Sequence, residues 1–191
     1  MTSRILLETE RLLLRAFTSD DVALLVELDS DPEVMRWING GTPTSLAFAE
    51  RVVVPTFTSY DGDLGFWAAH LKPDGPFVGW FSLRRNDDEE AALGYRLRRE
   101  AWGRGLATEG ASALIDLAFT KLGFSRVMAG TYEHNVRSRR VMEKLGMRLV
   151  RSARASSEDI AAADTYEVSS TEPWPGDDVE YAIDVDDFTR R

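Results

Sequence analysis

Apolar residues recur at intervals of three, four and seven after a glycine-rich stretch, and this spacing predicts a helix with one buried face. That face consists of Ala107, Ala111, Leu114, Ile115, Ala118 and Leu122. Gly123 is expected to end the helix. A strand is predicted just before the glycines, in the run from Ala92 to Leu97. The pattern therefore predicts a strand, a tight turn and a helix in immediate succession.

Further segments show the alternation or the start signals of regular structure. Strands are predicted at 12–15, 66–71, 77–83, 127–131, 148–150 and 179–185. Helices are predicted from Thr18, from Asp31 to Asn39, from Ser45 to Tyr60 with an interruption at Pro55, and from Asn135 to Met147. The turn residues 72–75 should join two of these strands into an antiparallel hairpin. The stretch 152–176 is long, polar and without clear periodicity, which is typical of a functional or mobile loop.

The glycine turn between the strand and the helix has the features of an anion site. Gly103 and Gly105 allow a ligand to approach the backbone, and the first N–H groups of a helix lack partners within it. A phosphate is the anion that we expect. The spacing lacks the third glycine of a dinucleotide-binding motif and the Lys-Ser/Thr of a nucleotide P-loop, so both are disfavoured. On this turn alone, a tight turn that binds nothing is an equal alternative.

A second motif follows the predicted strand at 127–131. The residues NVRSRRVMEKLGM (Asn135 to Met147) provide an asparagine start and a glycine stop for another helix. Together with LGYRLRREAWGRGLATEGASALIDLAF (Leu93 to Phe119), this motif resembles the GNAT superfamily of acetyl-CoA-dependent N-acetyltransferases, particularly the branch similar to ribosomal-protein N-terminal acetyltransferases. Weaker likeness extends to LETERLLLRAF (Leu7 to Phe17) and DVEYAI (Asp178 to Ile183).

The resemblance implies an α/β fold with a cofactor site. We expect a mixed, twisted, mostly antiparallel sheet of about six or seven strands, flanked by helices and splayed between the two motif strands to admit acetyl-CoA. The coenzyme A pyrophosphate should bind the N–H groups of the turn, aided by the helix dipole. The residues expected at the cofactor are Leu97, Trp102, Gly103, Arg104, Gly105, Leu106, Ala107, Thr108, Asn135 and Arg140. Trp102 stands where the family usually has arginine or glutamine, so a side-chain contact to phosphate must come from a neighbour such as Arg104.

The catalytic prediction rests on the start of the second motif helix. Asn135 is a favoured helix cap, and the resemblance implies that it also hydrogen-bonds the pantetheine arm or the acceptor. Ser138 lies in the first turn, where its hydroxyl can donate a hydrogen bond to a departing thiolate; a serine without a role is the alternative. Relatives often carry a tyrosine acid where this chain has Met142 and a glutamate base where it has Ala92. The sequence therefore assigns no general base.

The acceptor pocket is expected beside the early helices. In the resembling family this region overhangs the acceptor, so Trp37, Phe57 and Tyr60 are candidate pocket walls, with core packing as the alternative. Glu109 is a further candidate, although a glutamate in the first helical turn can simply complement the helix dipole. The loop 152–176 should border the same pocket.

Length and composition bear on domain number, disulfides, metal binding and the class of partner. The 191 residues suffice for a single domain spanning 1–191. The chain has no cysteine and only two histidines, His70 and His134, so we expect no disulfide and no bound metal. The net charge of -9 argues against nonspecific nucleic-acid binding. No apolar run approaches the length of a membrane span and no export signal is visible, so a cytoplasmic location is the default expectation. The resemblance implies a monomer or a homodimer.

The resemblance implies an N-acetyltransferase that transfers the acetyl group directly in a ternary complex. The expected acceptor is the α-amine of a peptide or protein, because an α-amine has a pKa of about 7.7–8.0 and needs less deprotonation near pH 7 than a lysine amine. A small-molecule amine or an aminoglycoside is the first alternative. A noncatalytic acyl-CoA-binding module is the second, because Ala92 and Met142 replace the usual base and acid.

Overall fold

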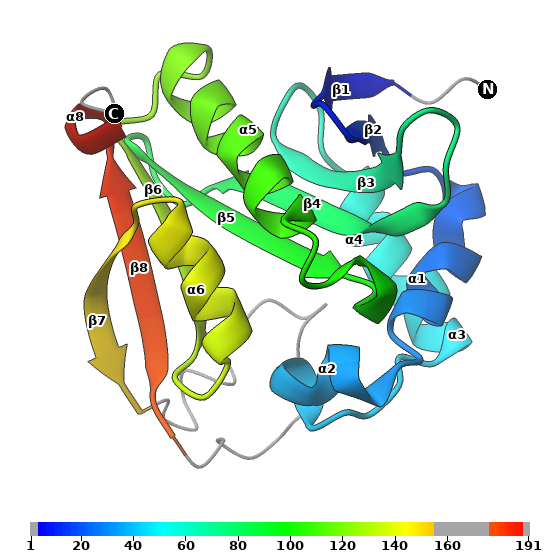
Figure 1. The fold of residues 1–191 in the computed structure, drawn as a ribbon. Helices are drawn as coiled ribbons and strands as arrows, with labels where there is room; N and C mark the ends of the chain where they lie inside the picture. The colour runs from blue at the N-terminus through cyan, green and yellow to red at the C-terminus, as the bar shows by residue number, and fades with distance from the viewer. Residues whose placement is uncertain (1–3, 155–175, 189–191) are drawn as a thin grey trace.

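The computed structural model describes residues 4–154 and 176–188, and this part of the chain forms one eight-stranded sheet (Figure 1). The strand order is β1-β2-β3-β4-β5-β6-β8-β7. Every neighbouring pair is antiparallel except β5 and β6, which are parallel. The strands are β1 (Ile5–Glu8), β2 (Leu12–Ala16), β3 (Gly65–Leu71), β4 (Phe77–Arg85), β5 (Glu90–Leu97), β6 (Arg126–Tyr132), β7 (Arg148–Ala153) and β8 (Asp178–Asp184). The predicted mixed, mostly antiparallel α/β fold is confirmed.

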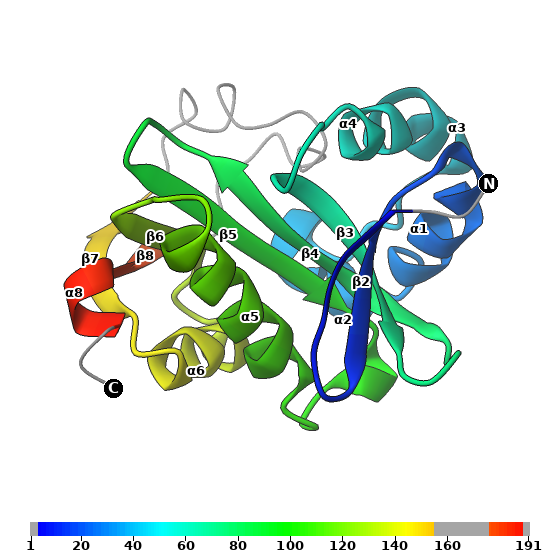
Figure 2. The ribbon, with the colours of Figure 1, turned by 90° about the horizontal axis from the view of Figure 1, so that it is seen from above.

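Helices cover both faces of the sheet (Figure 2). The long helix α5 (Leu106–Thr120) and α6 (Val136–Lys144) lie on one face, whereas α1 (Val22–Leu28) and α4 (Val54–Thr58) lie on the other. The remaining helical segments are α2 (Pro32–Asn39), α3 (Leu46–Phe48), α8 (Val185–Phe188), the 3-10 turns η1 (Ser19–Asp21) and η3 (Arg99–Ala101), and the π-helix η2 (Ala49–Val53).

Two clusters of buried side chains fill the spaces between the sheet and these helices. Trp67 and Phe81 belong to the cluster under α5, whereas their neighbours Phe66 and Trp80 belong to the cluster under α1 and α4. This period of two is what strands buried on both faces require. Gly110 allows α5 to lie very close to the sheet, because a Cβ there would lie 2.4 Å from the ring of Phe81. The start of α5 is therefore fixed against β4.

The buried face of α5 agrees with the prediction along most of the helix. It consists of Leu106, Gly110, Ala111, Leu114, Ile115, Ala118 and Phe119. Ala107 and Leu122, which we predicted for the same face, are only half-buried. Gly123 ends the segment as predicted: its φ of +75° is left-handed, and the following N–H, that of Phe124, returns to the carbonyl of Ala118 at 3.1 Å.

The edge strand β1 is an element that the sequence pattern did not predict. It pairs antiparallel with β2 and raises the number of strands above the six or seven expected. Its residues are exposed or half-buried, so they lack the alternation that identifies a strand with one buried face. Hydrogen bonding to β2, which is a tertiary contact, makes this segment a strand.

The helical stretch from Leu46 to Thr58 differs from the prediction at Pro55. The segments α3, η2 and α4 follow one another without a break, and Pro55 lies in the first turn of α4. The irregular part is the π-helix η2 just before it. A proline removes a donor from the helical ladder, and the wider turn of η2 accommodates this loss without ending the helix.

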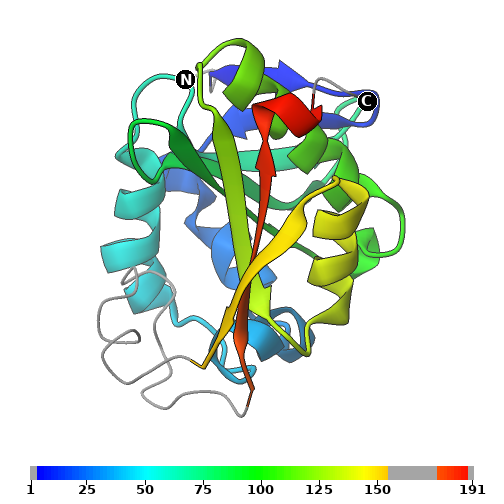
Figure 3. The same ribbon diagram turned by 90° about the vertical axis from the view of Figure 1, so that its left-hand side faces the viewer.

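The two motif strands β5 and β6 diverge, as the predicted splay requires. Their ladder joins residues 90–92 to residues 126–128 and ends there. Beyond Ala92, β5 continues in pairing with β4 alone, whereas β6 continues in pairing with β8. Figure 3 shows β6, β8 and β7 at this edge of the sheet, with α6 beside them. The divergence leaves the end of β5 next to the start of α6.

The predicted loop 152–176 lies mostly outside the described residues. Ser152 and Ala153 belong to β7, and residues 155–175 are not described, so the role of this loop beside the acceptor pocket stays a prediction. In the described ranges no helix has both the length and the apolar character needed to span a membrane.

Candidate active site

The glycine turn connects the end of β5 to the start of α5. After β5 ends at Leu97, the 3-10 turn η3 leads into Trp102, and the backbone then adopts positive φ angles at Gly103 (+71°) and Gly105 (+81°). Residues with a Cβ rarely adopt this left-handed conformation. The two glycines are therefore required by the path of the chain.

The N-terminus of α5 presents N–H groups that have no partner in the helix. The first bond of the ladder runs from the N–H of Glu109 to the carbonyl of Gly105 at 3.0 Å. Gly105 is the N-cap residue and has no side chain that could accept a hydrogen bond from the N–H groups of the first helical turn. The N–H groups of Leu106, Ala107 and Thr108 have no acceptor among the described residues. This geometry, together with the helix dipole, suits an anion.

Trp102 ties this turn to β5 and to α6. Its indole Nε1 donates to the carbonyl of Leu97 at 2.8 Å. The guanidinium of Arg137, in the first turn of α6, lies 4.7 Å from the centre of the Trp102 ring. The departure from the family pattern at Trp102 thus brings a different cation, Arg137, to the glycine turn. In the sequence, Arg137 is only one of many basic residues around the two motifs, so the pattern alone does not single it out as a neighbour of the glycine turn.

The other residues predicted at the cofactor contribute in different ways. Arg104 and Arg140 are exposed, so their guanidinium groups are accessible. The side chains of Leu97 and Leu106 are buried in the core, so only their backbone atoms can face a ligand. The backbone carbonyl of Leu97 already accepts the bond from Trp102.

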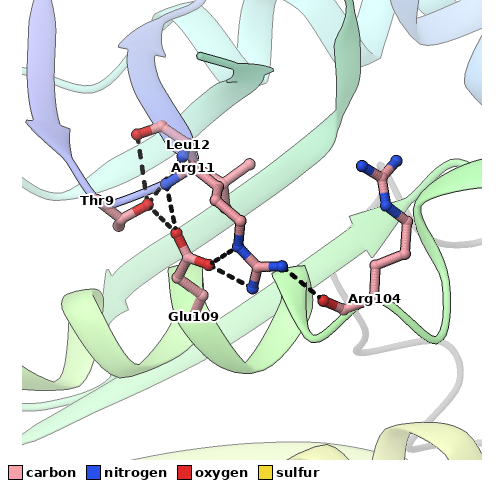
Figure 4. A network of polar contacts seen from close by, with 5 residues as sticks. All are labelled: Thr9, Arg11, Leu12, Arg104 and Glu109. Carbon is pink, nitrogen blue, oxygen red and sulfur yellow. Dashed lines mark hydrogen bonds and ion pairs between the residues drawn. The ribbon is translucent and has the colours of Figure 1, made fainter. Parts of the chain in front are cut away.

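The carboxylate of Glu109 joins α5 to the turn between β1 and β2 (Figure 4). Its Oε1 accepts from the hydroxyl of Thr9 at 2.5 Å and from the N–H of Arg11 at 2.8 Å, and its Oε2 accepts from Arg11 Nε at 2.6 Å. Burial acts to raise the pKa of Glu109, but the hydrogen bonds from Thr9 and Arg11 outweigh it and hold the pKa below its usual value. These contacts give Glu109 a structural role at the start of α5, and its place in the acceptor pocket stays a prediction.

Asn135 caps α6, as its position predicts. Its Oδ1 accepts from the N–H of Ser138 at 3.3 Å, and its Nδ2 donates to the hydroxyl of Thr131 at 3.0 Å. These two bonds stabilise the start of α6 beside the end of β6. Its predicted contact with cofactor or acceptor stays a prediction.

Ser138 has a partner that the sequence analysis did not identify, the phenol of Tyr95. The Ser138 Oγ lies 3.0 Å from the Tyr95 hydroxyl, and the same phenol donates to the Ser138 carbonyl at 3.2 Å. Burial raises the pKa of Tyr95 to about 12, although the bond with Ser138 acts to lower it. The phenol is therefore protonated near neutral pH. Tyr95 lies within the first motif, Leu93 to Phe119, but only the fold brings it to α6.

The positions of the usual acid and base contain no titratable group here. Met142 is fully buried in the core under α5 and α6. Ala92 pairs with Met128 at the last position of the parallel ladder. The neighbouring Glu90 pairs with Arg126 at 3.2 Å and so is held away from the widened gap between β5 and β6. The described residues also contain no group of three or more metal-ligating side chains.

The three aromatic candidates for the acceptor pocket have different surroundings. Phe57 is only 3% exposed and stacks on Phe66 with ring centres 3.9 Å apart, so the alternative of core packing holds for this residue. Trp37 is half-buried, with the guanidinium of Arg36 5.0 Å from its ring. Tyr60 is exposed and meets the ring of Phe66 edge-on. Trp37 and Tyr60 stay pocket predictions.

Comparison with known families gives a match over most of the chain. Residues 11–148 match the acetyltransferase (GNAT) domain. An uncharacterized N-acetyltransferase p20 of Bacillus licheniformis is 31% identical over 142 residues, which are 73% of this chain and 80% of that protein. An FsC-acetyl coenzyme A-N(2)-transacetylase of Aspergillus fumigatus is 33% identical over 155 residues, 74% of this chain and 64% of that protein.

Solved structures of low identity share the fold. An acetyltransferase of the GNAT family from Bacillus anthracis superposes with a TM-score of 0.75 at 24% identity, covering 93% of this chain and 96% of that one. The ribosomal L7/L12 α-N-protein acetyltransferase RimL, solved with coenzyme A, has a TM-score of 0.71 at 16% identity, covering 96% and 99%. A spermidine N-acetyltransferase from Vibrio cholerae, solved with coenzyme A and spermine, has a TM-score of 0.70 at 14% identity, covering 93% and 98%.

Proposed function

The chain belongs to the GNAT family of acetyl-CoA-dependent N-acetyltransferases, and we propose that its acceptor is the α-amine of a peptide or protein. Membership of this family favours an enzyme over the noncatalytic acyl-CoA-binding module. The acceptor proposal rests on one observation: the positions of the usual base and acid hold Ala92 and the buried Met142.

The start of α5 suits the pyrophosphate of coenzyme A. The unpaired N–H groups of Leu106, Ala107 and Thr108 offer donors to phosphate oxygens, and the helix dipole favours negative charge there. Arg137, held against Trp102, and the exposed Arg104 add positive charge beside the turn. When bound, acetyl-CoA supplies the activated acetyl thioester. The end of the β5–β6 ladder at Ala92 supports binding of the pantetheine arm between the diverging strands.

Ser138 and Tyr95 are suited to stabilise the departing thiolate. The Tyr95 phenol has one hydrogen, and either oxygen can be the donor in its 3.0 Å contact with the Ser138 Oγ. When the phenol donates to Oγ, the hydroxyl hydrogen of Ser138 can point toward a ligand beside β5. A thiol has a reference pKa of about 8.5, so a single hydrogen bond from Ser138 gives useful stabilisation without a strong acid. Tyr95 acts through Ser138 by fixing the orientation of its hydroxyl.

An α-amine is the acceptor that best suits a site with no base at the usual position. With a pKa of about 7.7–8.0, roughly a tenth of an α-amine is neutral at pH 7, whereas less than about a thousandth of a lysine amine with a pKa near 10.4 is neutral. The lysine amine would need a general base to supply its reactive form. For an α-amine, a water molecule can carry away the proton after attack.

Small-molecule amines are the second candidate class of acceptor, and the names of two similar proteins support it. The Aspergillus relative is named an FsC-acetyl coenzyme A-N(2)-transacetylase, and one structural neighbour is a spermidine N-acetyltransferase. The RimL neighbour, in contrast, is a protein α-N-acetyltransferase. At these identities the structural neighbours share the fold alone, so the choice depends on the acceptor chemistry argued above.

The test is an acceptor panel read by thiol release from acetyl-CoA. A peptide with a free N-terminus and no lysine is compared with the same peptide carrying a blocked N-terminus and one lysine, and with spermidine and an aminoglycoside. We expect the free N-terminus to give the highest kcat/KM near pH 7. Equal or faster turnover of the lysine peptide would refute the α-amine preference, and preferential turnover of spermidine or the aminoglycoside would establish the small-molecule candidate instead.

A further inference from the structure

The segment LETERLLLRAF lies far from the glycine turn in sequence but contacts it in the fold. The turn between β1 and β2 approaches the start of α5, and three of its donors converge on the carboxylate of Glu109 (Figure 4). Two of these donors, the backbone N–H and the Nε, belong to Arg11. The guanidinium is also paired with the carboxylate through its third nitrogen, Nη2, at 2.6 Å from Oε2.

Arg11 also reaches the glycine turn itself. Its Nη1 donates to the carbonyl oxygen of Arg104 at 2.9 Å, so one guanidinium spans the carboxylate of α5 and the backbone of the turn. The peptide group between Arg104 and Gly105 is planar and trans, so its C=O and N–H point in opposite directions. Holding the carbonyl toward Arg11 therefore directs the N–H of Gly105 away from Arg11.

We propose that Arg11 is a positioning residue for coenzyme A, which fixes the direction of the Gly105 N–H and neutralises Glu109 beside the pyrophosphate. This rests on the proposed cofactor site at the start of α5. The rigid fork of the guanidinium is suited to this task, because it can donate to two acceptors at once in one plane. Arg11 touches no reacting atom and acts through the turn.

The charge of Glu109 gives the pairing a second consequence. Glu109 lies in the first turns of α5, where its negative charge would repel a phosphate at the same helix end. Its side chain is 15% exposed, so water screens it only in part. Pairing with Arg11 cancels that charge locally and leaves the positive helix end, Arg104 and Arg137 to act on the ligand. Loss of Arg11 should therefore weaken phosphate binding in two ways.

The experiment compares ligands with and without the pyrophosphate in the variant Arg11→Met, which keeps an unbranched apolar stem. Calorimetry gives the Kd for coenzyme A, and kinetics give kcat/KM for acetyl-CoA and for S-acetylpantetheine, which has no phosphate. We expect at least a tenfold rise in the Kd for coenzyme A and a similar fall in kcat/KM for acetyl-CoA. We expect kcat/KM for S-acetylpantetheine to stay close to that of the unmodified protein. An equal fall for both thioesters would indicate general loss of structure and would overturn the proposal.

Lys72→Met is the matched control, because Lys72 holds the same chain segment without touching the glycine turn. Its Nζ donates to the carbonyl of Thr9 at 3.0 Å and pairs with Glu8 at 2.8 Å. We expect unchanged affinity for coenzyme A in this variant. A loss as large as that of Arg11→Met would mean that any loosening of the β1–β2 turn has this effect, and would overturn the specific role of Arg11.

Arg11→Lys covers the case in which Arg11→Met does not fold. Lysine keeps the charge opposite Glu109 but lacks the fork that spans the carboxylate and the Arg104 carbonyl. We expect a higher Kd for coenzyme A in Arg11→Lys as well. An affinity equal to that of the unmodified protein would refute the proposed role of the contact with the Arg104 carbonyl. The proposed cofactor site is tested separately by Gly105→Val. Weaker binding in Gly105→Val with normal binding in both Arg11 variants refutes only the positioning role, whereas normal binding in all three refutes the cofactor site too.

Discussion

Replacement of Gly105 by valine tests where the coenzyme A pyrophosphate binds. Gly105 has φ = +81° and is the N-cap residue of α5. A Cβ at this position would point toward Arg11, with Nη2 of Arg11 at 3.4 Å. Valine therefore acts on the turn from the side of Arg11. It disturbs the turn through backbone strain and through contact with the guanidinium.

The size of the effect follows from that strain. A residue with a Cβ in the left-handed region costs roughly 1–2 kcal/mol, and more for a β-branched residue. If the turn relaxes to relieve this strain, its N–H groups no longer converge on one point. We expect the affinity for coenzyme A to fall at least tenfold, which corresponds to about 1.4 kcal/mol.

Gly123→Val provides the matched control at the opposite end of the same helix. Gly123 has φ = +75°, and a Cβ there would meet nothing within 4 Å. Both variants should therefore show a comparable loss of stability in thermal unfolding, but only Gly105→Val should show weaker binding in calorimetry. A folded Gly105→Val protein that binds coenzyme A as tightly as the unmodified protein would refute the proposed site.

Three further predictions follow from ionisable and hydroxyl groups near the site. Ser138→Ala should lower kcat while leaving the affinity for acetyl-CoA nearly unchanged, and an unaltered kcat would remove Ser138 from the mechanism. Because the pKa of Tyr95 is about 12, Tyr95→Phe should not change the ultraviolet tyrosinate titration below about pH 10; a missing transition near pH 10 would contradict the burial of this phenol. The pKa of Glu109 is lower in the folded protein than its ordinary value of 4.5, so its ionised form stabilises the fold above that pH and this contribution is lost as the pH falls through the folded pKa. The stability difference between the unmodified protein and Glu109→Gln, measured by urea unfolding, should therefore shrink on acidification below pH 4.5, and a difference that grows there would contradict the sign of the shift.

Local sequence patterns determined the elements that surround the glycine turn. The spacing of Ala111, Leu114, Ile115 and Ala118 predicted the buried face of α5, because a helix repeats about every 3.6 residues whatever it packs against. Asn135 predicted the start of α6 for a similar reason, since a capping side chain bonds to an N–H only three residues away. The two glycines also predicted the tight turn, because a left-handed backbone conformation is readily adopted only by glycine.

Contacts between distant residues were decided by the tertiary structure alone. Of two aromatic residues in one segment, Phe57 is buried in the core and Tyr60 is exposed, and which face of the segment meets β3 is a property of the packed fold. Tyr95 and Ser138 are 43 residues apart, and Arg11 and Glu109 are 98 residues apart. No periodicity relates such pairs, because periodicity reflects the geometry of one element. The divergence of β5 from β6 brings the first pair together, and the packing of α5 beside the β1–β2 turn brings the second pair together.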